Sequence, residues 1–193
     1  MIKFSAELYL AITRFAQSTP EWVHSFADFG TDAGLLLFFA LFGWNAWRRK
    51  GTPEYRLALV APLAVIGAYL VSEVAKSLIQ EDRPCRAVAG ALPIAECPSV
   101  GDWSFPSNHA TIAASCAIVL TVLWTRLAPV VIPLAMLMAF SRVFVGVHYP
   151  HDVAAGFVVG STVGLLLALL AVRLVGPTRT PAPAPRAMAA PRR

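Results

Sequence analysis

The residues best suited to chemistry are His148 and Asp152, which lie four positions apart in the sequence. In a continuous helical turn, this spacing places both side chains on one face. A carboxylate that accepts a hydrogen bond from one ring nitrogen fixes the tautomer and leaves the other nitrogen free to attack an electrophile. The pair therefore predicts a nucleophilic histidine, although a simple local hydrogen-bonded pair has the same spacing. His151 has no such partner at helical spacing, and we expect it to lie outside the site.

Three cations, Lys76, Arg83 and Arg142, lie at the ends of apolar runs. If they share one membrane interface with His148, they repel one another and lose hydration, so a bound polyanion would stabilise the group. Phosphate suits this role because guanidinium groups match its oxygens in a bidentate fork. For Lys76 taken alone, a side chain that snorkels to the interface is an equally good interpretation.

Ser107 follows Pro106 and precedes an apolar run, which predicts a helix N-cap with the helix beginning near Asn108. The start of a helix offers free N–H groups and the positive end of the helix dipole, and both favour a bound anion. His109 falls in the first turn, from which an imidazole can donate a proton to a leaving oxygen. An interfacial histidine without a role is the alternative for His109 alone.

The predicted site does not require a metal. Three cations and a helix start can neutralise the oxygens of a phosphoryl group by themselves. The sequence has no carboxylate cluster of the kind that binds Mg²⁺, so we expect neither a metal nor another cofactor. Glu73, Glu81 and Asp82 are near the site in sequence and leave open an ion that arrives with the substrate.

The composition predicts a membrane protein. Hydrophobic residues make up 57% of the 193 residues and charged residues only 14%, whereas soluble domains carry roughly 25% charged residues. Several apolar runs approach the length of about 20 residues that crosses a bilayer. We therefore expect an all-α polytopic membrane helical bundle with five to six membrane helices. The net charge of +5 resides at the ends of apolar runs and in a Pro-rich tail, which indicates membrane topology rather than nucleic-acid binding.

Three regions follow from the apolar pattern. Residues 1–24 predict an amphipathic helix at the membrane interface, with a tilted spanning helix as the alternative. Residues 25–175 form the membrane domain, and residues 176–193 are expected to be a disordered cytoplasmic tail. The expected spans cover residues 32–47, 57–75, 109–124, 130–147 and 153–175. Gly156 and Gly160 permit close helix contact, more plausibly within the monomer than between monomers.

Basic residues predict the orientation. They cluster between the first two spans, between the third and fourth, and after the fifth, so these segments are expected to face the cytoplasm. The loop of residues 77–106 and the turn around His148 then lie on the outer side. Cys85 and Cys97 flank part of that loop, and in an oxidising compartment we expect them to form a disulfide that contributes about 3 kcal/mol.

These motifs carry a family resemblance. The pattern K-x6-RP, then PSNH, then SR-x5-H-x3-D resembles the three-part signature of the type 2 phosphatidic acid phosphatase superfamily. The resemblance implies that His148 is the nucleophile, that Asp152 orients it and that His109 protonates the leaving group. It also implies a phosphate site, which consists of Lys76, Arg83, Arg142, Ser107 and the backbone of Asn108. One departure is Asn108, which replaces the glycine usual in the family.

Within this superfamily, the short chain resembles the bacterial undecaprenyl-diphosphatases. The resemblance implies a phosphohistidine intermediate, a lipid pyrophosphate as substrate, membrane lipids as neighbours, and a site on the outer face of a bacterial inner membrane. It connects the chain with cell-wall synthesis and bacitracin resistance. A phosphatidylglycerophosphate or phosphatidate phosphatase and a lipid A phosphotransferase are alternatives with the same chemistry. A non-catalytic lipid-binding or transport protein is an alternative of another class.

Overall fold

The fold is all helical, as expected. The structure is a computed structural model that describes residues 2–176, so the predicted tail beyond Gly176 lies outside the described residues. Its elements are α1 (Ile2–Gln17), α2 (Glu21–Arg48), α3 (Tyr55–Val60), α4 (Pro62–Ile79), α5 (Pro84–Ala87), α6 (Asn108–Leu123), the 3₁₀ helix η1 (Thr125–Leu127), α7 (Ala128–Phe144) and α8 (Pro150–Val175).

Five helical segments form the bundle, and most of them suit a bilayer. Four are long and apolar enough to cross it: α2, the segment Tyr55–Ala87, the segment Thr125–Phe144, and α8. The fifth, α6, is apolar but has 16 residues, which corresponds to about 24 Å of helix. Large apolar side chains such as Phe39, Leu70 and Leu166 are exposed on the outside of the bundle. The chain is therefore a multi-pass membrane protein.

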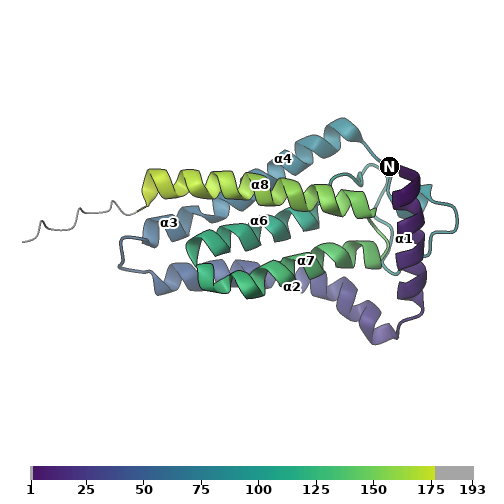
Figure 1. The fold of residues 1–193 in the computed structure, drawn as a ribbon, viewed down its shortest axis with the longest axis horizontal. Coiled ribbons are helices and arrows are strands. Elements are labelled where there is room, and N and C mark those ends of the chain that lie inside the picture. The colour runs from purple at the N-terminus through teal and green to yellow at the C-terminus, as the bar shows by residue number, and fades with distance from the viewer. Residues whose placement is uncertain (1, 177–193) are drawn as a thin grey trace, which may run out of the picture.

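Helix α6 lies at the centre of the bundle, among α2, α4, α7 and α8 (Figure 1). Its residues Ala113, Ala117 and Leu120 belong to the largest hydrophobic cluster. Because α6 is apolar on every side, it has no face suited to water, which is the pattern of a fully surrounded helix. The residues at its N-terminus are thereby held among the ends of its neighbours.

Close packing of α8 on α6 depends on glycine. A Cβ atom on Gly160 would lie 2.1 Å from the carbonyl oxygen of Thr111, and one on Gly156 would lie 2.4 Å from the carbonyl oxygen of Ser107. No side chain fits at these two positions without moving a backbone. The predicted close contact of Gly156 and Gly160 is therefore made within the chain.

The N-terminal helix differs from the prediction in its length. It ends at Gln17, and Pro20 is the N-cap of α2, so residues 21–24 begin the next helix. Proline disfavours helical backbone in the residue before it, which explains the break. Helix α1 lies across one end of the bundle, nearly perpendicular to the other helices (Figure 1). It is anchored there by Tyr9, which is fully buried and donates a hydrogen bond to the Gly146 carbonyl at 2.9 Å.

The two ends of the bundle differ in charge. The α2–α3 connection, the η1 segment and the end of α8 lie together at the end opposite α1 (Figure 1). They carry Arg48, Arg49, Arg126 and Arg173. The α4–α6 connection and the α7–α8 junction lie at the α1 end, where His148 is found. The separation matches the side assignment made from the positive-inside rule.

We predict that Gly160→Ala destabilises the protein because the added methyl group displaces α8 from the Thr111 backbone. A forced repacking of this kind costs about 1–3 kcal/mol. The measurement is the midpoint of thermal unfolding in detergent. Gly43→Ala is the matched control, since nothing lies within 4 Å of a Cβ on that α2 residue. Equal unfolding midpoints for the two variants would contradict the packing argument.

Candidate functional site

His148 is the centre of the site. It is 2% exposed and lies in the short connection between α7 and α8, two residues before α8 begins at Pro150. His148 and Asp152 do not share one continuous helical turn, the condition under which the spacing placed them on one face, because Tyr149 is an extended N-cap residue. The two side chains nevertheless meet, with His148 Nδ1 at 3.3 Å from Asp152 Oδ2.

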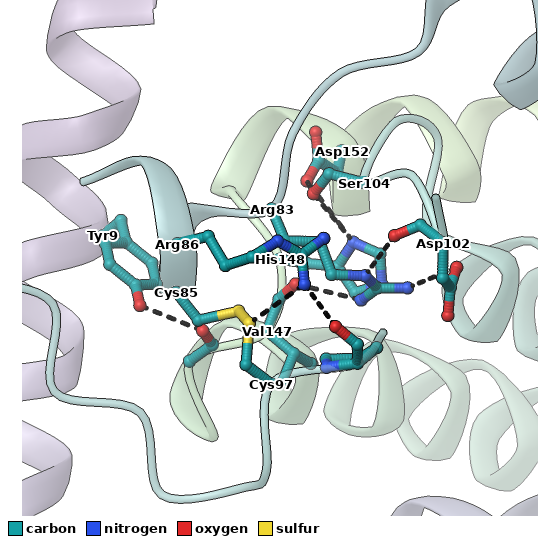
Figure 2. Close-up of a disulfide and its surroundings, with 12 residues drawn as sticks. Tyr9, Arg83, Cys85, Arg86, Cys97, Asp102, Ser104, Val147, His148 and Asp152 are labelled. Carbon is teal, nitrogen blue, oxygen red and sulfur yellow. Dashed lines mark hydrogen bonds and ion pairs between the residues drawn. A yellow bond between two sulfur atoms is a disulfide. The ribbon is translucent and has the colours of Figure 1, made fainter. Parts of the chain in front are cut away.

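The contacts of the ring determine its tautomer. His148 Nε2 lies 3.1 Å from Arg83 Nη1 (Figure 2). A guanidinium can only donate, so Nε2 is the acceptor and carries the lone pair. The proton is then on Nδ1, which donates to Asp152. This arrangement presents an unprotonated nitrogen toward Arg83 and away from Asp152.

Asp152 is held from several directions. It is fully buried in the first turn of α8. Its Oδ2 accepts from the Tyr149 N–H at 2.8 Å and from the hydroxyl of Ser104. Its backbone carbonyl accepts from the Ser107 N–H at 3.1 Å. The carboxylate beside His148 is thus bonded to the loop before α6, and the backbone of Asp152 is bonded to Ser107, the N-cap residue of that helix.

Two of the predicted phosphate-binding cations are buried beside His148. Lys76 lies in the last turn of α4, and Arg83 lies just before α5. Their side chains are 8% and 5% exposed, and both contact Asp102 Oδ1, at 3.2 Å from Lys76 Nζ and 2.9 Å from Arg83 Nη2. Arg83 also donates to the carbonyl of Val147 at 3.1 Å, which fixes it against the segment that carries His148.

Arg142 is the third cation and lies in the last turn of α7. Its Nε is buried and has no hydrogen-bond partner within residues 2–176. A buried donor without an acceptor is costly, and an anion that approaches His148 would supply one. Arg142 is therefore the cation whose bonding is least satisfied by the described protein.

The start of α6 has the geometry expected of an N-cap. The Ser107 hydroxyl accepts from the Ala110 N–H at 3.5 Å, and Ser107 is fully buried. The side chain of Asn108 is held by α4: its Oδ1 accepts from the Ser72 hydroxyl at 2.7 Å, and its Nδ2 donates to Glu73. Since Asn108 bonds to α4 in this way, its backbone N–H is the group more readily offered to an anion.

His109 is paired with a residue that the sequence did not indicate. Its Nε2 lies 3.1 Å from Asp32 Oδ1 of α2, and the histidine side chain is 29% exposed. A carboxylate bonded to one ring nitrogen fixes the orientation of the imidazole. The pair therefore consists of an imidazole that can transfer a proton and a carboxylate that orients it.

The cations act on His148 through its protonation. Burial lowers the pKa of His148 well below 6.5, and the charges of Arg83, Arg142, Lys76 and His109 lower it further. The group is thus neutral at pH 7, in agreement with the tautomer inferred from Arg83. These four residues were all predicted from the sequence, and their charges act on the same histidine ring.

His151 does not stand apart, contrary to the sequence interpretation. Its Nε2 lies 3.1 Å from both carboxylate oxygens of Glu81 and 3.2 Å from Asp152 Oδ1, while Nδ1 is 2.7 Å from the Ser5 hydroxyl of α1. Ligand atoms of Glu81, His151 and Asp152 lie within 4.8 Å of one another. The histidine lies between these two carboxylates, while Asp152 Oδ1 has no hydrogen-bond partner within residues 2–176. The expectation of a metal-free site stays a prediction.

The sequence that forms this site matches a known protein family. Residues 56–175, which include every residue of the site except Asp32 and Ser5, match the PAP2 superfamily. This chain belongs to the PAP2 superfamily. A decaprenylphosphoryl-5-phosphoribose phosphatase of Mycobacterium tuberculosis is 35% identical over 133 residues, which are 68% of this chain and 68% of that protein.

Two further PAP2 relatives bear on the assignment. A protein named undecaprenyl-diphosphatase from Sulfolobus acidocaldarius is 32% identical over 61% of this chain and 55% of its own length. The chain thus spans little more than half of that relative. The crystal structure of a transmembrane PAP2-type phosphatidylglycerolphosphate phosphatase from Bacillus subtilis has a TM-score of 0.63 at 25% identity, covering 84% of this chain and 83% of that one.

The loop between α4 and α6 supplies residues of the candidate site that the sequence did not indicate. Asp102 contacts Lys76 and Arg83, and Ser104 contacts Asp152. Figure 2 shows Asp102 beside Arg83 and Ser104 beside Asp152. Asp32 and Glu81 were not assigned roles either. Ser104 and Asp102 lie within seven residues of His109 in the sequence, so proximity to PSNH was the available signal. Asp32 had only the weak signal of a carboxylate beside an apolar run.

Cys85 and Cys97 are joined in a disulfide in this loop, with Cα atoms 6.0 Å apart (Figure 2). Arg86 donates to the carbonyl of Pro98 nearby. Cys116 is buried in α6 and unpaired within the described range. The bond closes a short loop between Arg83 and the Asp102–Ser104 segment, so it restrains the residues that surround His148.

We predict that Cys85 and Cys97 react with a membrane-impermeant maleimide only after reduction. The readout is mass spectrometry of labelled peptides from intact cells or right-side-out vesicles. Cys116→Ser serves as the background for labelling, because its thiol is buried. Labelling of either cysteine without reductant would contradict the disulfide.

We also predict that His148 titrates below pH 6.5, because a charged ring would be buried among like charges. The measurement is NMR of histidine-labelled protein in detergent, and the four histidines of the chain are assigned by single substitutions. Arg83→Gln removes the nearest cation and should raise the pKa of His148 toward 6.5. A midpoint at or above 6.5 in the unsubstituted protein would refute the neutral nucleophile.

Proposed function

We propose that this chain is an integral membrane lipid phosphatase that hydrolyses a polyprenyl pyrophosphate, such as undecaprenyl pyrophosphate, to its monophosphate. The observation that carries the proposal is the unprotonated Nε2 of His148, which lies 3.1 Å from Arg83 in the field of Lys76 and Arg142. A terminal phosphate that bonds to these cations would lie against the nitrogen that holds the lone pair. That is the approach an in-line attack on phosphorus requires.

In the first step, Nε2 of His148 attacks the terminal phosphorus, and an N–P bond forms. The bond from phosphorus to the bridging oxygen breaks, and its electron pair leaves with the lipid monophosphate. Lys76, Arg83 and Arg142 neutralise the equatorial oxygens as charge develops. Asp152 stabilises the positive charge on the ring through the Nδ1–H bond.

In the second step, water attacks the phosphohistidine. His109 protonates the leaving oxygen in the first step and then accepts a proton from the attacking water, as microscopic reversibility requires. Asp32 keeps the ring of His109 oriented for both transfers. The N–P bond breaks, inorganic phosphate leaves, and His148 returns to its neutral form.

Two observations support a polyprenyl lipid. The relatives described above are named for undecaprenyl and decaprenylphosphoryl substrates, and both names denote long isoprenoid tails. An apolar groove between α2 and α7 is lined by residues such as Phe26, Leu134 and Phe144, and its lining includes the polar residues Thr31 and Ser141. These two residues adjoin Asp32 and Arg142 in the chain. A tail that lies in this groove would thus place its phosphates at the His109 side of the site.

The proposed location is the outer face of a bacterial inner membrane. The site lies at the end of the bundle opposite the arginine-rich connections (Figure 1), and a disulfide lies in the loop beside it. Both features are typical of the side away from the cytoplasm. At that face, the reaction would return a polyprenyl carrier to the monophosphate form used in cell-wall synthesis.

A phosphatidylglycerophosphate phosphatase is the second candidate, favoured by the fold shared with the Bacillus subtilis enzyme of that name. The two functions differ in their leaving group. A lipid phosphate leaves as a stabilised anion, because a phosphate monoester has a second pKa of about 6. An alcohol requires a proton from a general acid. Dependence on His109 therefore distinguishes them.

We predict that the purified protein in detergent releases phosphate from undecaprenyl pyrophosphate faster than from phosphatidylglycerophosphate or phosphatidate. His148→Ala should reduce release by at least about 10³-fold, because the nucleophile is removed. His109→Ala should slow formation of the phosphorylated enzyme from the monoesters by roughly 10²-fold or more and its formation from the pyrophosphate much less, whereas hydrolysis of the phosphohistidine should slow equally for both.

Thermal unfolding of each variant serves as the control for folding. Near-normal release from a folded His148→Ala protein would eliminate the phosphohistidine mechanism. Equal turnover of all three lipids would leave a general lipid phosphatase in place of the pyrophosphate enzyme. Binding without turnover in the unsubstituted protein would favour the non-catalytic class.

A further inference from the structure

The phosphate site already contains an anion, which is the carboxylate of Asp102. Its Oδ1 lies between Lys76 Nζ, at 3.2 Å, and Arg83 Nη2, at 2.9 Å. One oxygen shared by two cations is the contact that a phosphate oxygen would make in the same place. Asp102 and a phosphate therefore compete for the same two donors.

The burial of the three side chains is unequal. The side chains of Lys76 and Arg83 are 8% and 5% exposed, whereas that of Asp102 is 45% exposed. The cations are fixed on α4 and beside α5, and Arg83 is held further by its bond to the Val147 carbonyl. The carboxylate is the partner that can rotate away at little cost, because water can solvate it.

The surrounding backbone allows this rotation. Asp102 follows Gly101, which has a φ of +92°, and its N–H donates to the Ser99 carbonyl in a turn. Its own carbonyl accepts from Arg83 Nε at 2.8 Å, and the Ser104 N–H is bonded to Glu81. The main chain is thus anchored on both sides of the residue, and only the side chain need move. A polar cavity of about 630 Å³, lined in part by Lys76, Ser77, Gln80 and Asp102, is open to receive it.

Asp102 is negatively charged at neutral pH, as a competitor of phosphate must be. Burial raises the pKa of Asp102, but the hydrogen bonds and charges of Arg83 and Lys76 outweigh burial, so its pKa is lowered overall. The group stays ionised at neutral pH. It compensates two buried cations when no substrate is present, which avoids the cost of an unpaired buried charge.

We propose that Asp102 is a residue of the substrate site whose carboxylate holds the place of a phosphate oxygen between Lys76 and Arg83 and exchanges with phosphate in each turnover. This inference rests on the proposed phosphatase function. On substrate binding, the carboxylate yields the two donors and turns to water. After hydrolysis, it returns to them and displaces inorganic phosphate, so its effect is to weaken product retention.

The alternative is a fixed positioning role, in which Asp102 only orients Arg83. The two roles predict opposite changes in phosphate affinity when the charge of Asp102 is removed. If Asp102 competes, removing its charge tightens phosphate binding. If Asp102 positions Arg83, removing its charge weakens phosphate binding because the guanidinium loses its orientation.

The test is calorimetric binding of inorganic phosphate to the full-length protein in detergent, which does not depend on turnover. We expect Asp102→Asn to lower the Kd for phosphate on the order of tenfold, since the competing charge is lost while the shape of the side chain is kept. Asp82→Asn is the matched control. It removes the same charge from the same loop, and Asp82 is exposed and makes no ion pair within residues 2–176.

Two further measurements test whether phosphate affinity rises or falls when the charge of Asp102 is removed. Phosphate should raise the unfolding midpoint of Asp102→Asn more than that of the unsubstituted protein, because the two cations regain a partner. Asp102→Ser, which also lacks the charge, should show the same tighter binding. Phosphate binding that is unchanged or weaker in both folded variants would overturn the proposal.

Failure of the proposed function gives a different result. In that case, the unsubstituted protein neither releases phosphate from any of the three lipids nor binds inorganic phosphate. If it hydrolyses lipid and binds phosphate while the Asp102 variants bind no tighter, the phosphatase stands and the exchange role of Asp102 is refuted.

Discussion

The site depends on the repulsion of buried cations at one end of a helical bundle. Lys76 and Arg83 are almost fully buried, and Arg142 has a buried N–H without an acceptor in the described protein. Charges in such surroundings are poorly solvated and must find a partner. The same field keeps His148 neutral, because a further positive charge there is unfavourable. The polyanion binding that we propose and the unprotonated imidazole of His148 thus have one cause, which is this charge distribution.

Packing within the membrane sets the geometry of this charge cluster. Glycines on α8 let it approach the backbone of α6, so that the Ser107 N–H reaches the Asp152 carbonyl at 3.1 Å. The first turn of α8 then carries the carboxylate that holds His148, and the first turn of α6 carries His109. Asp152 and His109 are therefore positioned by a single helix contact, which includes the N-cap residue Ser107.

The segments outside the bundle complete the site from two sides. The disulfide-bonded loop brings Asp102 to the cations and Ser104 to Asp152. Helix α1 crosses the same end and reaches the α7–α8 junction through Tyr9 and the His151 cluster through Ser5. These contacts restrain the turn that carries His148 without adding charge to it. The carboxylate of Asp102 in this loop pairs with two of the buried cations.

The sequence by itself determined the residue types of the site, the helical class of the fold and the distribution of basic residues between its two ends. These features follow from local order: a motif such as PSNH, an apolar run, and a cap before a helix are complete within a few residues. Only the tertiary structure revealed Asp32 beside His109, Asp102 between Lys76 and Arg83, and His151 between Glu81 and Asp152. Each of those pairs except His151–Asp152 joins residues far apart in the chain. An isolated carboxylate carries no sequence mark of the partner that folding brings to it, because the pairing energy depends on burial and distance, which exist only after the helices have packed.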